Sequence, residues 1–186
     1  MSDGLLWTTD SVKTILDTPV FTVEAKLQHA EAGPKGTYYS IQGKRCVCIV
    51  AEYEGKLIMV RQWRHGSEEI TAELPGGVID EGETPEHAAA RELEEESGFR
   101  AGKITLLGKI NPNPALFNKG SDLHVCLAEE LTPTYTLHPD ADEVIQNTMV
   151  PLAEVIDGLG SGEYTHAFMG TALLMYLRHK RCSESI

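Results

Sequence analysis

Residues 77–99 read Gly-Val-Ile-Asp-Glu-Gly-Glu-Thr-Pro-Glu-His-Ala-Ala-Ala-Arg-Glu-Leu-Glu-Glu-Glu-Ser-Gly-Phe. The second half of this stretch predicts a helix over 84–97. Thr84 suits the N-cap, Pro85 suits the first helical position, and Gly98 suits the residue that ends the helix. The glycine-rich first half therefore forms a loop that leads into the helix.

The predicted helix has one apolar and one crowded acidic side. Ala89 and Leu93 stand four residues apart and form a stripe that can pack on a sheet. Glu92 and Glu96 have the same spacing, and Glu95 stands three residues after Glu92. Like charges at these spacings destabilise a helix, and a hard divalent cation reverses that effect because it prefers carboxylate oxygens. The alternative is a solvated acidic face, which explains most runs of glutamate.

The flanks of this stretch predict a mixed α and β protein, because no regular alternation of strands and helices appears. Glu54 and Gly55 are expected to form a hairpin turn. Residues 64–82 are expected to be mainly loop, as are 111–121, which are rich in turn formers. The predicted strands are 21–30, 38–41, 45–52, 56–63, 103–110, 123–128 and 144–150, and the later helices are 151–158 and 165–180.

Composition and charge narrow the classes of function. Of the 186 residues, 41% are hydrophobic and 24% charged, which is typical of a folded globular domain. The net charge of −12 argues against nucleic acid held by its phosphates. An anionic substrate would need a cation in such an acidic protein.

The chain shows no sign of export or of a membrane segment. Residues 1–10 lack a basic region followed by an apolar run, and no apolar stretch approaches ~18 residues. The four cysteines include no CxxC pair, so they do not predict a zinc site. We therefore expect a cytoplasmic protein.

The full spacing of residues 77–99 is similar to the Nudix box, a motif of enzymes that hydrolyse nucleoside diphosphates linked to another moiety. Residues 60–64, 73–77 and 162–167 resemble flanking segments of the branch that acts on ADP-ribose and nucleoside diphosphate sugars. The resemblance implies an α/β (α+β) fold with a mixed sheet sandwiched between helices. Every fixed position of the box is present, namely Gly77, Glu83, Arg91, Glu92, Leu93, Glu95, Glu96, Gly98 and Phe99.

The resemblance also implies roles for individual residues. The metal ligands, for Mg²⁺ or Mn²⁺, would be Glu92, Glu95, Glu96 and the Gly76 carbonyl. Arg91 would orient the glutamates, Glu83 would support the box, and Glu95 would contribute to catalysis. The general base would come from the acidic loop after residue 137, with Glu143 favoured and Asp140 and Asp142 as alternates. The predicted substrate contacts are Arg64, Glu73, Phe117 and Tyr39.

The substrate class stays open within this branch. Pro114 stands where ADP-ribose enzymes commonly carry a proline, but residues 113–118 lack the Pro-Gly turn and trailing acid of many of them. The expected reaction is hydrolysis of ADP-ribose or a related nucleoside diphosphate sugar to a nucleoside monophosphate and a sugar phosphate. A non-catalytic nucleotide-binding Nudix module is the alternative, and mRNA decapping is disfavoured by the charge.

The expected domain organisation is a β-strand region over 1–43 followed by a Nudix domain over 44–186. The first region contains two predicted strands, which form too small a sheet to be stable alone. Because this branch usually dimerises through such strands, a homodimer is expected. Arg64 and the Tyr38–Tyr39 pair are expected to reach substrate across its interface.

Overall fold

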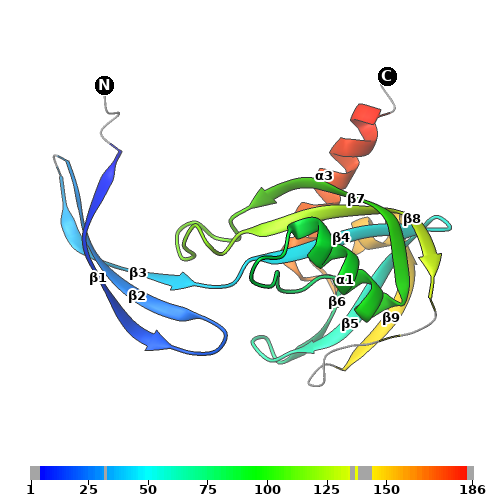
Figure 1. Ribbon diagram of the computed structural model, residues 1–186, viewed down its shortest axis with the longest axis horizontal. Helices are drawn as coiled ribbons and strands as arrows, with labels where there is room; N and C mark the ends of the chain where they lie inside the picture. The colour runs from blue at the N-terminus through cyan, green and yellow to red at the C-terminus, as the bar shows by residue number, and fades with distance from the viewer. Residues whose placement is uncertain (1–4, 32, 135–136, 138–143, 184–186) are drawn as a thin grey trace. The chain divides into compact units, whose positions relative to one another are not determined.

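The computed structural model describes residues 5–31, 33–134, 137 and 144–183, and its chain divides into two compact units. The first unit consists of Met1–Arg45 and Asn111–Asp122. The second consists of Cys46–Ile110 and Leu123–Ile186. The first unit is therefore assembled from two separate stretches of the chain (Figure 1).

The first unit is built on a three-stranded antiparallel sheet of β1 (Trp7–Asp17), β2 (Thr22–Ala30) and β3 (Lys35–Gln42). Its second stretch pairs with the end of β3, since Ile41 N donates to Leu116 O at 2.8 Å and Asn118 N donates to Ile41 O at 3.0 Å. Two strands were predicted in this region, and β1 was not among them. Every residue of β1 is exposed, so the strand lacks the in-and-out apolar alternation by which a strand is recognised.

The second unit contains a mixed sheet in the order β6-β5-β4-β8-β7. β9 stands outside this order and pairs with β5. β4 and β8 run parallel, and the remaining pairs are antiparallel. The strands are β4 (Cys46–Tyr53), β5 (Lys56–Arg64), β6 (Glu69–Glu73), β7 (Phe99–Ile110), β8 (Leu123–Pro133) and β9 (Ile145–Pro151).

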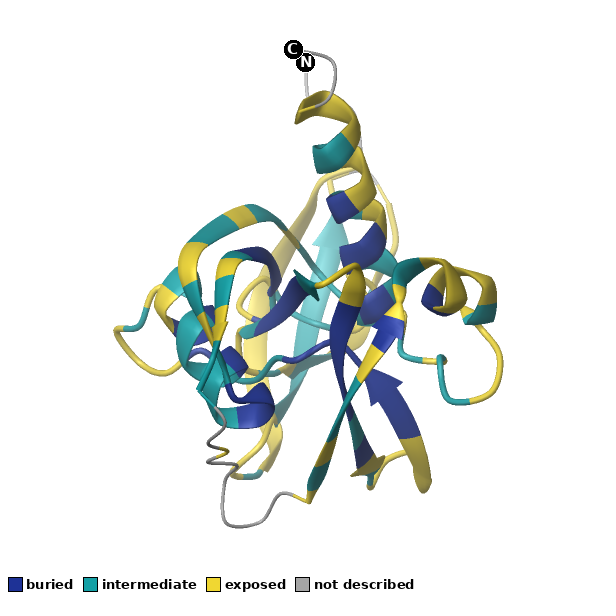
Figure 2. Cartoon of the chain, turned by 90° about the vertical axis from the view of Figure 1, so that its right-hand side faces the viewer, coloured by how far each residue is buried: buried dark blue, intermediate teal, exposed yellow. Residues whose placement is uncertain are grey.

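Helices cover both faces of this sheet (Figure 2). Alternate residues of β4 divide between the two cores, as Val47 and Ile49 pack with α1 (Pro85–Ser97) while Cys48 and Val50 pack with α3 (Ala167–Ser183). The short helix α2 (Leu152–Gly158) adds Val155 to the α3 side. The predicted mixed sheet between helices is confirmed.

The helix predicted from its caps is also confirmed. Thr84 caps α1 by accepting a hydrogen bond from His87 N at 3.3 Å, and Pro85 stands in the first turn. Gly98 ends the helix with φ 69°, a left-handed conformation that glycine adopts without strain. The hairpin turn at Glu54 and Gly55 has positive φ at both residues, as a type I′ turn requires.

Some predicted boundaries were wrong. β6 lies in a stretch expected to be loop, because its Glu-Ile-Thr-Ala-Glu sequence is bounded by glutamates rather than by turn formers. β7 begins directly after Gly98, earlier than expected, and β8 continues beyond residue 128. In the described residues, no helix is long and apolar enough to span a membrane.

Candidate active site

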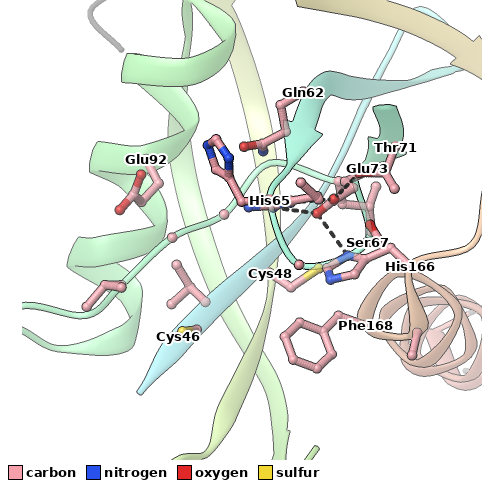
Figure 3. Close-up of a pocket in the computed structure, with 18 of the residues that line it drawn as sticks. Cys46, Cys48, Gln62, His65, Ser67, Thr71, Glu73, Glu92, His166 and Phe168 are labelled. Atoms are coloured by element: carbon pink, nitrogen blue, oxygen red, sulfur yellow. Dashed lines mark hydrogen bonds and ion pairs between the residues drawn. The ribbon is translucent and has the colours of Figure 1, made fainter. Parts of the chain in front are cut away.

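The second unit holds a pocket of about 990 Å³. β4 and β5 pair only beside their hairpin turn, and further along β4 pairs with the segment that follows β6. This divergence leaves room for the pocket. Figure 3 shows Glu92 of α1 on one side and Glu73 with His166 on the other.

Arg91 organises the α1 side of the pocket. Its Nη1 donates to Glu92 at 2.9 Å and to Glu95 at 3.0 Å. Its Nε and Nη2 donate to the Glu83 carboxylate at 3.2 and 3.1 Å, and Nη2 also reaches the Val78 carbonyl at 3.0 Å. Hydrogen bonding to Glu83 is the largest of the effects that raise the pKa of Arg91, and the same bond lowers the pKa of Glu83.

The loop before the helix packs directly against the acidic side chains. Val47 N donates to Gly77 O and Ile49 N donates to Pro75 O, both at 2.8 Å, so these two carbonyls face β4. The Gly76 N–H between them donates to Glu96 Oε2 at 2.8 Å.

These residues fit a hard divalent cation. The available donors are carboxylate and carbonyl oxygens, which Mg²⁺ and Mn²⁺ prefer. A Cβ added at Gly77 would overlap the Glu92 carboxylate, so the loop and the helix meet without spare room. In the described part of the chain, no three acidic, His or Cys side chains are already gathered as a ligand set. Glu92 and Glu95 are instead turned toward Arg91.

Glu73 organises the opposite side of the pocket. Only 2% of its side chain is exposed, and Arg64 binds it with two hydrogen bonds, from Nε at 2.7 Å and from Nη2 at 2.6 Å. Thr71 Oγ1 and His166 Nδ1 complete its contacts at 2.5 and 2.9 Å. Burial alone raises the pKa of Glu73, but these donors outweigh burial and hold the pKa well below the ordinary 4.5.

The segment that carries His166 is bound to the sheet through Glu163, three residues before His166 in the chain. Arg61 of β5 donates to Glu163 from Nε at 2.7 Å and from Nη2 at 2.5 Å, and to Gln146 of β9 at 2.9 Å. Ala72 N of β6 donates to the Glu163 carbonyl at 2.9 Å. These hydrogen bonds therefore fix the residues that lead into α3 against β5 and β6.

The structure brings most of the predicted site residues together. Glu96 is buried beside the pocket and bonds to the Gly76 N–H. Tyr39 and Phe117 line a separate hollow of about 640 Å³ in the first unit. The favoured base Glu143 and its alternates Asp140 and Asp142 lie outside the described residues. The predicted residues that line the pocket are Arg64, Glu73, Gly76, Arg91, Glu92 and Glu95.

Two polar residues that bind Glu73, Thr71 and His166, were not among the predicted site residues. Thr71 lies on β6, a strand that was not predicted, so its side chain could not be assigned to a face. His166 lies in a recognised segment, but no pattern pairs it with a glutamate so distant in the chain. A lone polar residue just before a helix was the only available signal.

Comparisons with known proteins agree with this geometry. The NUDIX domain family model matches residues 42–168. ADP compounds hydrolase NudE of Escherichia coli (strain K12) is 30% identical over 167 residues, covering 89% of this chain and 88% of that protein. ADP-ribose pyrophosphatase of Bacillus subtilis (strain 168) is 35% identical over 133 residues, covering 71% and 70%. A crystal structure of an ADP compounds hydrolase matches with a TM-score of 0.85 and 28% identity over 97% of both chains. The chain belongs to the Nudix family.

Proposed function

We propose that this protein hydrolyses the diphosphate bond of ADP-ribose or a related nucleoside diphosphate sugar, giving a nucleoside monophosphate and a sugar phosphate. The observation that supports it most directly is a single pocket lined by the α1 glutamates and the Arg64–Glu73 pair. Relatives named as ADP compounds hydrolase and ADP-ribose pyrophosphatase support the substrate class.

In this proposal Glu92, Glu95, Glu96 and the Gly76 carbonyl hold Mg²⁺ or Mn²⁺. A cation held by these residues would supply the positive charge that neutralises a diphosphate and lowers the pKa of a bound water. Arg91 keeps Glu92 and Glu95 beside the pocket, and Glu83 in turn holds Arg91. We propose Glu143 as the residue that takes the proton of the attacking water, with Asp140 and Asp142 as alternates.

Arg64 supplies positive charge opposite the acidic helix. With 42% of its side chain exposed in a wall of the pocket, its guanidinium can face a phosphate while Glu73 fixes its plane. Arg64 and the α1 glutamates line one pocket within the second unit. We therefore assign Arg64 to the site of its own subunit, in place of the expected contact across a dimer interface.

We also propose a homodimer formed through the first unit. Large apolar side chains are exposed along β1 and next to it, and patches of this kind mark protein interfaces. In this proposal Tyr39 and Phe117 of one subunit contribute to the substrate site of the other. The exposed residues are Trp7, Val12, Ile15, Leu16, Val20 and Phe21.

The proposed compartment is the cytoplasm. All four cysteines fall in the described residues and carry thiols rather than disulfides. Burial raises the pKa of Cys126 to about 12 and raises that of Cys48 further, so both behave as small apolar side chains.

Product analysis tests the proposed reaction. The protein is incubated with ADP-ribose and Mg²⁺ in ¹⁸O-labelled water, and the products are analysed by mass spectrometry. We expect AMP and ribose 5-phosphate, with ¹⁸O in only one of them and no reaction in EDTA. The contrary outcome is that the protein binds ADP-ribose tightly but hydrolyses neither ADP-ribose nor any of a panel of nucleoside diphosphate sugars. That result would indicate a non-catalytic module.

A further inference from the structure

The hydrogen bonds of Glu73 use the whole acceptor capacity of its carboxylate. Oε1 accepts from Arg64 Nε and Thr71 Oγ1, and Oε2 accepts from Arg64 Nη2 and His166 Nδ1. An ionised carboxylate has about four acceptor positions, two on each oxygen. Glu73 therefore has no position left for a ligand, and its role is to hold Arg64 and His166 in fixed positions next to each other.

This arrangement sets the tautomer of His166. A carboxylate oxygen only accepts, so the Nδ1 that faces Glu73 must carry a proton. In a neutral imidazole protonated at Nδ1, Nε2 is a hydrogen-bond acceptor.

The acceptor nitrogen is available to the pocket. His166 lines the pocket with 30% of its side chain exposed, and its ring packs on Phe168 with the ring centres 4.8 Å apart. Among the described residues, no group hydrogen-bonds to Nε2. The imidazole is thus held by Glu73 and Phe168 while one nitrogen stays open to a ligand (Figure 3).

We propose that His166 is a specificity residue whose Nε2 accepts a hydrogen bond from a hydroxyl of the substrate's sugar, beside the phosphate contact made by Arg64. This inference rests on the proposed function. A sugar phosphate carries a hydroxyl donor close to phosphate acceptors, and the two side chains held by one carboxylate present the complementary pattern. A lone pair on Nε2 repels phosphate oxygens, so His166 contacts the sugar and not the diphosphate.

The contact between His166 and the sugar is tested by changing both the residue and the substrate. His166→Asn keeps a donor where Nδ1 stood and removes the atom at Nε2. Assays at about pH 8, where free imidazole is neutral, compare ADP-ribose with the methyl ester of ADP, which has no sugar on its second phosphate. For His166→Asn we expect kcat/KM to fall about tenfold on ADP-ribose and less than about twofold on the methyl ester. Equal losses on both substrates would overturn the proposal and leave His166 a positioning residue.

A second measurement does not depend on turnover. ¹⁵N spectra of histidine-labelled protein report which imidazole nitrogen carries the proton, and the signal missing from His166→Asn identifies His166. His179→Asn, on α3 and outside the pocket, is the matched control. We expect a proton on Nδ1 and a shift of the Nε2 signal on addition of α,β-methylene ADP-ribose. A proton on Nε2 in the free protein, or an Nε2 signal unchanged at saturation, would refute the inference.

Failure of the wild-type protein to hydrolyse either substrate would refute the proposed function, and the spectra would then decide the inference alone.

Discussion

Arg91 compensates for the repulsion among the acidic residues of α1 and its entry loop. One guanidinium contacts Glu83, Glu92 and Glu95, each within 3.2 Å. Like charges this close would otherwise destabilise the helix. The same contacts hold the carboxylates of Glu92 and Glu95 beside the pocket.

The first prediction concerns Glu96, which is buried and bonded to the Gly76 N–H. In Glu96→Gln the amide oxygen can still accept that hydrogen bond, so the fold is retained, but the charge that holds a cation is lost. We expect kcat on ADP-ribose at saturating Mg²⁺ to fall by at least about a hundredfold. The control is Glu94→Gln on the same helix, since Glu94 pairs with Arg100 and lies outside the pocket. Wild-type turnover by Glu96→Gln would remove Glu96 from the ligand set.

The second prediction concerns Glu73, a buried carboxylate that is bound by the partly exposed Arg64. Glu73→Gln removes the charge of a buried carboxylate and turns an amide N–H₂ toward its donors. Because the Arg64 side chain is 42% exposed, solvent limits the cost to about 2 kcal/mol of stability. Donors that outweigh burial hold the pKa of Glu73 below 4.5, so its stabilising contribution is complete above that pH and declines as the pH falls below it. Denaturant unfolding should show a lower free energy of unfolding for Glu73→Gln than for the wild-type protein at pH 7, and a smaller difference between the two in acid.

Glu163→Gln is the matched control for this second prediction. Arg61 binds Glu163 with the same two-bond geometry, but 43% of the Glu163 side chain is exposed, against 2% for Glu73. We expect a much smaller loss of stability, because solvent screens exposed pairs. Similar losses for the two variants would show that burial does not determine the strength of the Glu73 network.

At this scale, sequence predicted the residues whose spacing reflects local geometry. Glu92 and Glu96 were placed on one helix face because four residues make about one helical turn, and the structure puts both beside the Gly76–Gly77 loop. Glu73 and His166 show the opposite case. They meet because separate strands and a helix pack together, and no local pattern in the chain records that contact.

Helix α1 is the element that links fold to chemistry. Ala88, Ala89 and Leu93 are fully buried against the sheet, while the acidic side faces the pocket. The small alanines let the helix lie close to β4, where the Gly76–Gly77 segment is also hydrogen-bonded. Packing on the sheet therefore determines how far the carboxylates stand from the loop carbonyl.

The third prediction is that a divalent cation stabilises the protein through this helix. A ligand that binds only the folded state adds about 2.7 kcal/mol at a hundredfold excess over its Kd. We expect a higher Tm in excess Mg²⁺ than in EDTA. A variant carrying both Glu92→Gln and Glu96→Gln should lose this difference. Equal Tm values for the wild-type protein in both buffers would show that the carboxylates are not a metal site.

Elements were predictable where capping residues and apolar periodicity coincide. For α1, Thr84, Pro85 and Gly98 mark both ends, and its position was correct within a residue. β1 and β6 were missed for different reasons. β1 is exposed throughout, so no buried face imposes a pattern, and β6 is only five residues long with polar ends. Pairing with neighbouring strands, rather than their own sequence, makes these two segments strands.

The fourth prediction concerns the whole molecule, which we expect to be a homodimer formed through the first unit. The exposed apolar side chains of β1 would be covered by a second copy. Light scattering at assay concentration should give twice the chain mass of 20.4 kDa. Leu16→Lys, which places a charge where 48% of a leucine is exposed, should shift the mass toward monomer. A wild-type mass of 20.4 kDa would end this proposal.

Mixing inactive subunits tests whether each site draws on both chains. A Tyr39→Ala subunit and a Glu96→Gln subunit should regain activity in mixed dimers, because one of the two sites then carries neither change. Arg64→Ala with Glu96→Gln is the control pair, since both residues belong to the second unit and no site escapes a change. No regain by the first pair, with mixed dimers shown to form, would confine each site to one subunit.

The pairing of β3 with residues 116–118 affects the order in which the protein forms during its synthesis. The ribosome delivers β1, β2 and β3 first, but the segment that pairs with Ile41 emerges only after β4 to β7 have been made. Domains that are continuous in sequence can fold one after another from the N-terminus. Here the first unit begins before the second and cannot be completed until β7 has left the ribosome, so the two units must form as interleaved steps of one process.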